Sequence, residues 1–210
     1  MTGLSTRAIG RAAVRGELAS IALPRFFDAG FDNVTFDDLA TAAGVSRSTF
    51  LRYFGNKEDV VLFVFDPLGD AMSAALASRP ATEDEWTALR RAVDPAVALL
   101  TREPGEGLAL LRLVWNTPAL WGRLHEKQAS WRPALAGHLA ERSGAGATSP
   151  LALRTRAMAA LGCLMVALDS WVDGNGRDDL GALTDLTFGA LAPIHPCHHD
   201  DDRTPTEGSA

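Results

Sequence analysis

Three helix N-cap signals within about twenty residues constrain this chain more than any other feature of its sequence. They are Thr35, Ser46 and Asn56, each of which precedes a short run of helical character. Gly44 lies between the first two helices, where it ends one and allows a tight turn into the next. Two short helices joined in this way are the layout of a helix-turn-helix, whose second helix enters the major groove of DNA.

The residues at the start of the second helix suit contact with DNA. Arg47 can donate to guanine N7 and O6, and the hydroxyls of Ser48 and Thr49 can bind bases or phosphates. Phe50 and Phe54 lie four residues apart and are expected to anchor the inner face of the helix. The alternative is an ordinary helical hairpin with solvated arginines, because short motifs often match by chance.

The charge distribution places any DNA-facing surface in the N-terminal part of the chain. The net charge of −6 argues against nucleic acid as a partner, because phosphates would be repelled. Residues 1–60, however, carry seven basic and seven acidic groups, so the whole negative excess lies in the remainder. Arg7, Arg11 and Arg15 recur at four-residue spacing, which predicts either a basic stripe that reaches the DNA backbone or a solvated helix face.

The rest of the chain also has a helical pattern. Apolar residues recur at steps of three and four, and we find no alternating strand pattern and no internal repeat. One helix is expected before Gly30, with Pro24 kinking its last turns. The other helices are expected from Lys57 towards Ser78 through Pro67, from the cap Thr82 to Leu100 with a bend at Pro95, and over residues 105–116, 118–142, 150–172 and 178–191. The fold class is therefore all-α.

Composition limits where the protein acts. The hydrophobic content of 47% is enough to bury a core without metal or disulfides, and the spacing of Cys163 and Cys197 does not suggest a disulfide framework. The longest uninterrupted apolar stretch, residues 157–168, is shorter than the roughly 18–20 residues that cross a bilayer. The N-terminus also lacks the pattern of a secretory signal. We expect a cytoplasmic protein without a membrane partner.

The helix-turn-helix region carries a resemblance to a known family. The segments FFDAGFDNVTFDDLA (26–40) and AGVSRSTFLRYFGNKE (43–58) resemble the TetR family of bacterial regulators without a gap. One departure is Leu51, which stands where many members have a tyrosine that touches the DNA backbone, so that contact is assigned to Arg52. The resemblance implies base contacts at Arg47, Ser48 and Thr49, phosphate contacts at Tyr53 and Lys57, and a backbone clamp at Thr35.

The resemblance also implies a division of the chain. Residues 1–56 would form a three-helix DNA-binding domain, residues 57–193 a larger helical ligand-binding and dimerisation domain, and residues 194–210 a disordered polar tail. The helix that starts at Lys57 would swing when a ligand binds and move the two recognition helices of a dimer. The residues expected to line a ligand pocket are Met72, Trp86, Leu111, Trp115, Trp121, His125 and Met158, although a single tryptophan is more often plain core.

Dimerisation is expected through the last two helices. The apolar seam from Met158 to Val172 and the helix from Leu180 to Leu191 would form four helices across a two-fold axis. The competing interpretation is that this seam packs only inside one chain.

No reactive constellation predicts an enzyme, a cofactor or a metal. His138 and Glu141 are half of a di-iron carboxylate pattern whose second half is missing, and the tail with His195, Cys197, His198, His199 and Asp200–Asp202 has nothing that fixes a metal geometry. The predicted function is a ligand-responsive DNA-binding regulator, a repressor released from its operator by a small apolar or aromatic effector. The alternative is a helical small-molecule or protein-binding module that no longer reads DNA.

Overall fold

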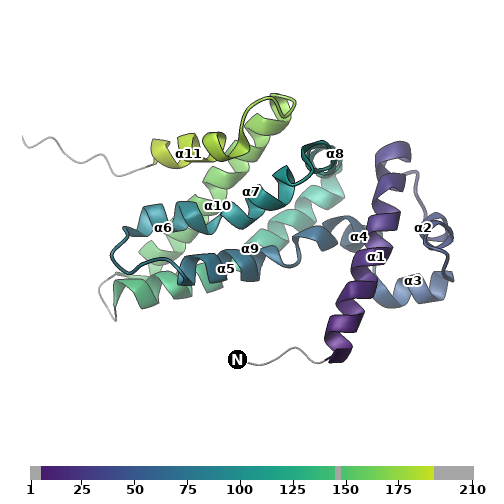
Figure 1. The fold of residues 1–210 in the computed structure, drawn as a ribbon, viewed down its shortest axis with the longest axis horizontal. Helices are drawn as coiled ribbons and strands as arrows, with labels where there is room; N and C mark the ends of the chain where they lie inside the picture. The colour runs from purple at the N-terminus through teal and green to yellow at the C-terminus, as the bar shows by residue number, and fades with distance from the viewer. Residues whose placement is uncertain (1–5, 145–147, 192–210) are drawn as a thin grey trace, which may run out of the picture.

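The computed structural model describes residues 6–144 and 148–191, and every regular element in these ranges is helical (Figure 1). The all-α class predicted from the sequence is thereby confirmed. The predicted polar tail, with its histidines, aspartates and Cys197, lies outside the described residues. The elements are α1 (Thr6–Ala29), α2 (Phe36–Ala42), α3 (Arg47–Tyr53), α4 (Lys57–Leu62), the 3₁₀ turn η1 (Phe63–Phe65), α5 (Leu68–Ala77), α6 (Glu85–Ala92), α7 (Asp94–Thr101), α8 (Pro104–Trp115), α9 (Pro118–Ser143), α10 (Pro150–Asp173) and α11 (Leu180–Ala190).

Helices α1–α4 form a small unit at one end of the molecule, here called the head (Figure 1). Helices α5–α11 form the body, and η1 connects the two. The three predicted caps begin α2, α3 and α4. Thr35 Oγ1 accepts from the Asp38 amide at 3.2 Å, Ser46 Oγ from the Thr49 amide at 3.2 Å, and Asn56 Oδ1 from the Asp59 amide at 2.7 Å. Gly44 has a φ of +66°, the left-handed region that the turn between α2 and α3 requires.

The capping box at the start of α2 is complete. The Asp38 carboxylate accepts from both the hydroxyl and the backbone amide of Thr35, at 2.7 and 2.8 Å. These hydrogen bonds favour the ionised form and lower the pKa of Asp38 below its ordinary value, with the Thr35 hydroxyl contributing most. The beginning of the helix-turn-helix is thus held by contacts between residues three apart.

A chain of phenylalanines forms the core of the head. Phe26, Phe50 and Phe54 are fully buried, so the predicted anchoring of α3 by Phe50 and Phe54 is confirmed. Phe50 packs edge-on against Phe36 of α2, and Phe54 packs edge-on against Phe63 of η1, with ring centroids 5.9 Å apart in each pair. The recognition helix is therefore attached through its inner face to both α2 and η1.

The helix expected from Lys57 to Ser78 is interrupted, which corrects the prediction of one continuous helix. It consists of α4, η1 and α5, with the break directly before Pro67. Pro67 has no amide hydrogen and its ring clashes with the carbonyl four residues earlier, so the α-helical bond to Phe63 O cannot form here. The amide of Asp66 donates instead to Phe63 O at 3.0 Å, which is a 3₁₀ bond.

The prediction of one helix from Thr82 to Leu100 is also wrong, both in its start and in its continuity. It starts after Asp84, whose carboxylate accepts from the amides of Trp86 and Thr87, so Asp84 and not Thr82 is the cap. It ends at Ala92, and α7 begins anew with Pro95 in its first turn, where a missing amide donor costs nothing. By contrast α1 runs through Pro24 to Ala29 as a single helix.

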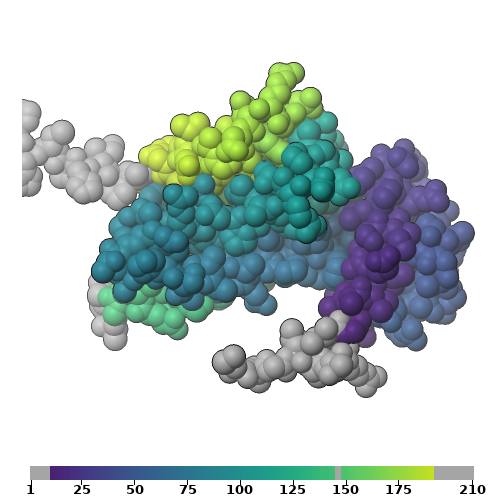
Figure 2. All heavy atoms as spheres, viewed as in Figure 1, coloured from purple at the N-terminus to yellow at the C-terminus, as the bar shows by residue number. Residues whose placement is uncertain are grey.

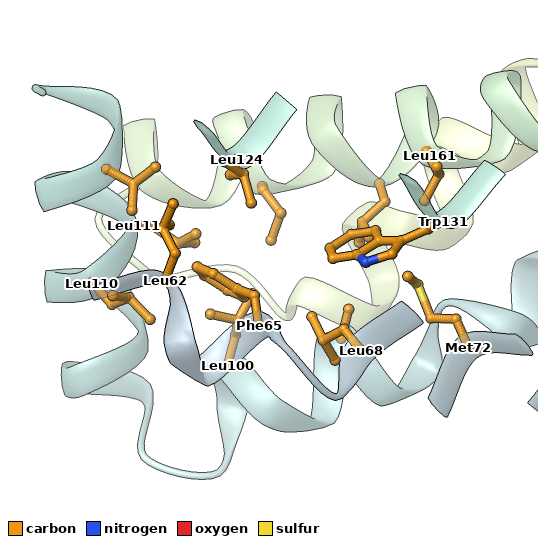
Figure 3. Packing of buried hydrophobic residues seen from close by; sticks show 14 of the residues in the cluster. Leu62, Phe65, Leu68, Met72, Leu100, Leu110, Leu111, Leu124, Trp131 and Leu161 are labelled. Atoms are coloured by element: carbon orange, nitrogen blue, oxygen red, sulfur yellow. The ribbon is translucent and has the colours of Figure 1, made fainter. Parts of the chain in front are cut away.

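The body packs around α9. Leu62, Phe65 and Leu68 point from α4, η1 and α5 toward Leu124 and Trp131 of α9 (Figure 3). These side chains fill the centre of the body with apolar contacts. By length and composition alone, the segments Lys57–Ala77 and Pro150–Asp173 are apolar enough to cross a membrane, but core helices meet the same test and both segments contribute buried side chains here.

A buried arginine ties α11 to the rest of the body. The guanidinium of Arg90 donates to Asp185 Oδ1 and Asp94 Oδ1, each at 2.5 Å, and to Gly181 O at 3.2 Å. A buried cation must be paired in this way, because an unpaired one would lose its hydration without compensation. Arg90 therefore fixes the position of α11 beside α6 and α7.

Helices α10 and α11 both expose large apolar side chains. Met158 is 51% exposed, Val166 54% and Leu186 71%. Met158 and Val166 lie eight residues apart on α10, so they share one side of that helix. Exposed apolar residues that gather on one face favour an interaction surface over scattered single exposures.

Replacing Gly69 with alanine is expected to lower the free energy of unfolding by about 1–3 kcal/mol, because the added Cβ would overlap the indole of the buried Trp131. Gly137→Ala on α9 is the matched control. Nothing lies within 4 Å of its added Cβ, so it should raise the stability by about 0.5–1 kcal/mol. Urea unfolding at one fixed protein concentration measures both, and equal effects would contradict this packing.

Candidate nucleic-acid interface

The first turn of α3 is polar and open to solvent. Arg47, Ser48 and Arg52 are exposed, while Phe50 on the opposite side is buried. The helix has only seven residues, Arg47–Tyr53, so it consists of about two turns. A polar first turn backed by a buried aromatic face is the geometry that a recognition helix needs.

The side chains of this first turn are already ordered without DNA. Ser46 Oγ lies 3.0 Å from Ser48 Oγ and donates to Thr49 Oγ1 at 2.9 Å, so the cap residue also holds the next two hydroxyls. Arg47 Nε lies 3.6 Å from Asp37 Oδ1 of α2. Both side chains of this ion pair are well exposed, so a DNA phosphate or base can compete with Asp37 for the guanidinium.

Two arginines flank Tyr53 at the end of α3. Arg11 of α1 donates to the carbonyl of Arg52 at 2.9 Å, which caps the C-terminus of the recognition helix with a positive charge. The guanidinium carbons of Arg11 and Arg52 lie 5.7 and 5.4 Å from the centre of the Tyr53 ring. Arg11, Arg52 and Tyr53 therefore form one cationic cluster on the exposed side of the head.

The basic stripe expected along α1 is divided by the structure. Arg11 turns toward α3, whereas Arg15 turns into the junction with the body, where it lies over the rings of Phe54 and Phe63. The side chain of Arg7 is outside the described residues. Four-residue spacing placed Arg11 and Arg15 on one face, but only the packing of α3 and η1 decides which of them reaches solvent near the recognition helix.

Lys57 has an internal role that the sequence did not predict. Its ammonium donates to Phe31 O at 3.0 Å and to Val34 O at 2.9 Å, and it lies 4.6 Å from the centre of the Phe31 ring. These bonds hold the loop between α1 and α2 against the start of α4. An ammonium has three donors, so one is left for a phosphate.

The residues predicted to line a ligand pocket do not come together. Met72 and Leu111 lie in the buried core of the body (Figure 3). Trp115, Trp121 and His125 form a separate, partly exposed aromatic cluster at the junction of α8 and α9. Trp86 packs on Phe188 of α11 and donates to its carbonyl at 2.9 Å, while Met158 lies on the exposed face of α10.

Within residues 6–144 and 148–191, no three His, Cys, Asp or Glu side chains are placed to hold a metal ion. His138 and Glu141 of the half di-iron pattern bind each other at 2.9 Å on α9. Cys163 is buried, and burial raises the pKa of its thiol, so it stays protonated.

Two protein families match this chain. Residues 22–64, which contain the helix-turn-helix, match the family described as bacterial regulatory proteins, tetR family. Residues 69–196, most of the body, match the family described as MftR C-terminal domain. The chain belongs to the TetR family. The resemblance seen in the helix-turn-helix is thus confirmed, and this TetR-family protein is a DNA-binding transcriptional regulator.

Individual relatives agree with this assignment. The chain is 30% identical over 187 residues to the Mycobacterium tuberculosis protein assigned as the mycofactocin biosynthesis transcriptional regulator MftR, covering 86% of this chain and 89% of that protein. It is 31% identical to the HTH-type transcriptional regulator TcmR of Streptomyces glaucescens, over 68% of this chain and 65% of that protein. Its fold is similar to FadR from Bacillus subtilis, solved with stearoyl-CoA, with a TM-score of 0.63, 20% identity, and coverage of 86% and 99%.

Lys57→Met is expected to lower the free energy of unfolding by about 1–3 kcal/mol, because the carbonyls of Phe31 and Val34 lose a charged donor at a partly buried site. Arg91→Met, on the exposed side of α6, is the matched control and should change stability by less than about 0.5 kcal/mol. Thermal unfolding compares the two. A Lys57 variant as stable as the wild type would mean that the ammonium does not hold the loop.

Proposed function

We propose that this TetR-family protein is a repressor whose α3 helix reads an operator and that a small apolar or aromatic molecule releases it. The observation that carries the proposal is the first turn of α3. Arg47, Ser48 and Thr49 stand together at its start, Ser46 orders their hydroxyls, and Phe50 anchors the helix from behind. Arg47 would read guanine, and the two hydroxyls would contact bases or adjacent phosphates.

Backbone contacts are proposed for two groups of residues. One group is Arg52 and Tyr53, and the contact of Arg11 with the Arg52 carbonyl adds Arg11 to this group. A second group of proposed contacts is Thr35 at the start of α2 and Lys57 at the start of α4, which would use its remaining donor. Phosphate contacts of this kind set the register of the protein on the duplex and leave base selection to the first turn of α3.

The effector site is proposed within the core of the body around Met72 and Leu111. The adjacent buried side chains include Trp131 and Gln128, and the Gln128 amide donates to the sulfur of Met165. A thioether is a weak acceptor, so an oxygen of a ligand would be a better partner for this buried amide. FadR from Bacillus subtilis, whose fold is similar, was solved with stearoyl-CoA, so a protein of this fold can hold a ligand with an apolar part.

We propose that the two domains meet at residues 56 and 57. We also propose that the protein acts in the cytoplasm and that it does not catalyse a reaction. The family matches divide the chain slightly later, because the first ends at residue 64, after α4, and the second begins at residue 69. The relatives that match are named as transcriptional regulators, which supports a regulatory role without enzymatic activity.

A homodimer through α10 and α11 is proposed as the DNA-binding form. Met158, Val166 and Leu186 are exposed apolar side chains that a two-fold partner would cover, and Arg90 holds α11 beside α6 and α7. Two recognition helices then contact half-sites about one helical turn, or 34 Å, apart.

Arg47→Glu is expected to abolish specific DNA binding, because the reversed charge repels phosphates and removes the donor to guanine. The test selects genomic fragments with the purified wild-type chain and then titrates the retained duplexes with each variant at several salt concentrations. Arg91→Glu, an exposed charge reversal on α6, is the control and should keep at least about a third of the wild-type affinity. Equal binding by wild type and the Arg47 variant would support the alternative module that does not read DNA.

Val166→Glu is expected to shift the dimer dissociation constant upward by at least about tenfold, because the carboxylate would be desolvated in an apolar interface. Val14→Glu on α1 introduces the same change at a position that is 42% exposed on the head, and it should leave the dimer intact. Sedimentation velocity over a range of concentrations measures both. A wild-type chain that stays monomeric, or a Val166 variant that dimerises normally, would contradict the proposed interface.

A further inference from the structure

The line along which the head meets the body contains a polar hollow. α1 lies against α4, η1 and α8, and α4 lies against α9, so the junction runs between these helices (Figure 2). On the side of α9 it encloses a volume of about 280 Å³ lined by charged groups from both parts. The charged residues are Arg15 of the head, Asp59 of α4, Asp66 after η1, and Arg123, Glu126 and Lys127 of α9.

Asp66 holds a cation from each side of this junction. One carboxylate oxygen lies 3.5 Å from Arg15 Nη1, and the other accepts from Lys127 Nζ at 2.5 Å. The side chains of Arg15, Asp66 and Lys127 are only 26%, 35% and 24% exposed, so water screens these pairs less than it screens a surface ion pair. We call Arg15, Asp66 and Lys127 the Asp66 bridge.

The head end of the bridge is attached to the recognition helix. The guanidinium of Arg15 lies 5.0 Å from the centre of the Phe54 ring and 4.6 Å from that of Phe63. Phe54 is the C-cap residue of α3. A displacement of Arg15 therefore acts on the residue that ends the recognition helix, because the ring of Phe54 is fully buried and close-packed interiors transmit strain.

The body end of the bridge is attached to the core. In the sequence Asp66 lies between Phe65 and Leu68, which both point into the buried core (Figure 3). It immediately precedes Pro67, at the break between η1 and α5. At such a break the backbone is free of the α-helical hydrogen bond that would otherwise fix the angle between α4 and α5. A change in the core packing at Phe65 or Leu68 therefore moves Asp66 relative to Arg15 and Lys127.

We propose that Asp66 is a positioning residue for DNA recognition, which sets the angle of the head on the body through Arg15 and Lys127. The inference rests on the proposed function, because the angle matters only when two heads must fit two half-sites. The bridge replaces the backbone constraint that Pro67 removes. Without it the head keeps its own fold but takes a range of angles, so the separation of the two α3 helices is no longer defined.

The first test measures the choice of half-site spacing. Inverted-repeat duplexes selected by the wild-type chain from a random-sequence pool are remade with spacers two base pairs shorter and longer. Wild-type affinity should fall by about tenfold or more on the altered spacers, whereas Asp66→Asn should lose less than about threefold. Glu126→Gln is the matched control, because Glu126 lines the same hollow but pairs with Arg123 inside α9, and it should behave like the wild type.

Lys127→Gln breaks the bridge from the body side and leaves every residue of the head unchanged. On the altered spacers it should lose as little affinity as Asp66→Asn does. The double variant should show no further change, because both substitutions break the same linkage. A general loss of stability lowers affinity for all spacers alike and leaves their ratio unchanged. An unchanged ratio in the Asp66 or Lys127 variant therefore overturns the proposal.

The second test needs no DNA and separates this inference from the proposed function. Nitroxide labels at Thr41→Cys on α2 and Ala134→Cys on α9, in a chain with Cys197→Ser, report the distance from head to body by pulsed electron resonance. Labelled chains are mixed with excess unlabelled chain so that only distances within one chain are recorded. The distance distribution should become at least about twice as wide in Asp66→Asn and stay unchanged in Glu126→Gln. If the wild-type chain retains no specific duplex but the distance distribution widens in Asp66→Asn, only the proposed function is contradicted. An unchanged width in Asp66→Asn overturns the role of Asp66.

Discussion

Burial of Phe54 at the end of the recognition helix is the contact on which the rest of the structure depends. The helix α3 has seven residues, and isolated helices of that length are unstable in water. Its geometry must therefore come from tertiary packing, which Phe50 and Phe54 supply by burying their rings against α2 and η1. Because Phe54 also contacts Phe63, the same packing joins the DNA-reading surface to the segment that leads into the body.

The arginines and lysines of the head divide between two tasks. Arg11 and Arg52 gather around Tyr53 on the exposed side, whereas Arg15 and Lys57 bind groups within the protein. Cations with protein partners at partly buried sites organise the head, and cations with exposed side chains remain for phosphates. The net charge of the N-terminal sixty residues is zero, so this division, not an excess of basic residues, creates the surface that suits DNA.

The body combines a filled centre with polar junctions. Trp131 occupies the space that the absent side chain of Gly69 leaves free, and Gln128 lies buried with a sulfur as its acceptor. A ligand that enters near Met72 must therefore displace packed side chains instead of filling an open space, which couples its binding to movement of α5 and η1. The aromatic residues that suggested a pocket from sequence serve in three different places, because helix periodicity does not specify which helices are neighbours.

The sequence by itself determined the local structure of this protein. Thr35, Ser46 and Asn56 cap their helices as predicted, and Gly44 makes the turn, because each of these interactions joins residues only a few positions apart. The all-α class followed from the same short-range rules. Only the tertiary structure decided that Lys57 binds the carbonyls of Phe31 and Val34 and that Asp66 joins α1 to α9. It also decided that Arg11 binds α3 whereas Arg15 binds Asp66. These contacts join residues more than twenty positions apart, and their partners are set by how whole helices pack, which no local pattern encodes.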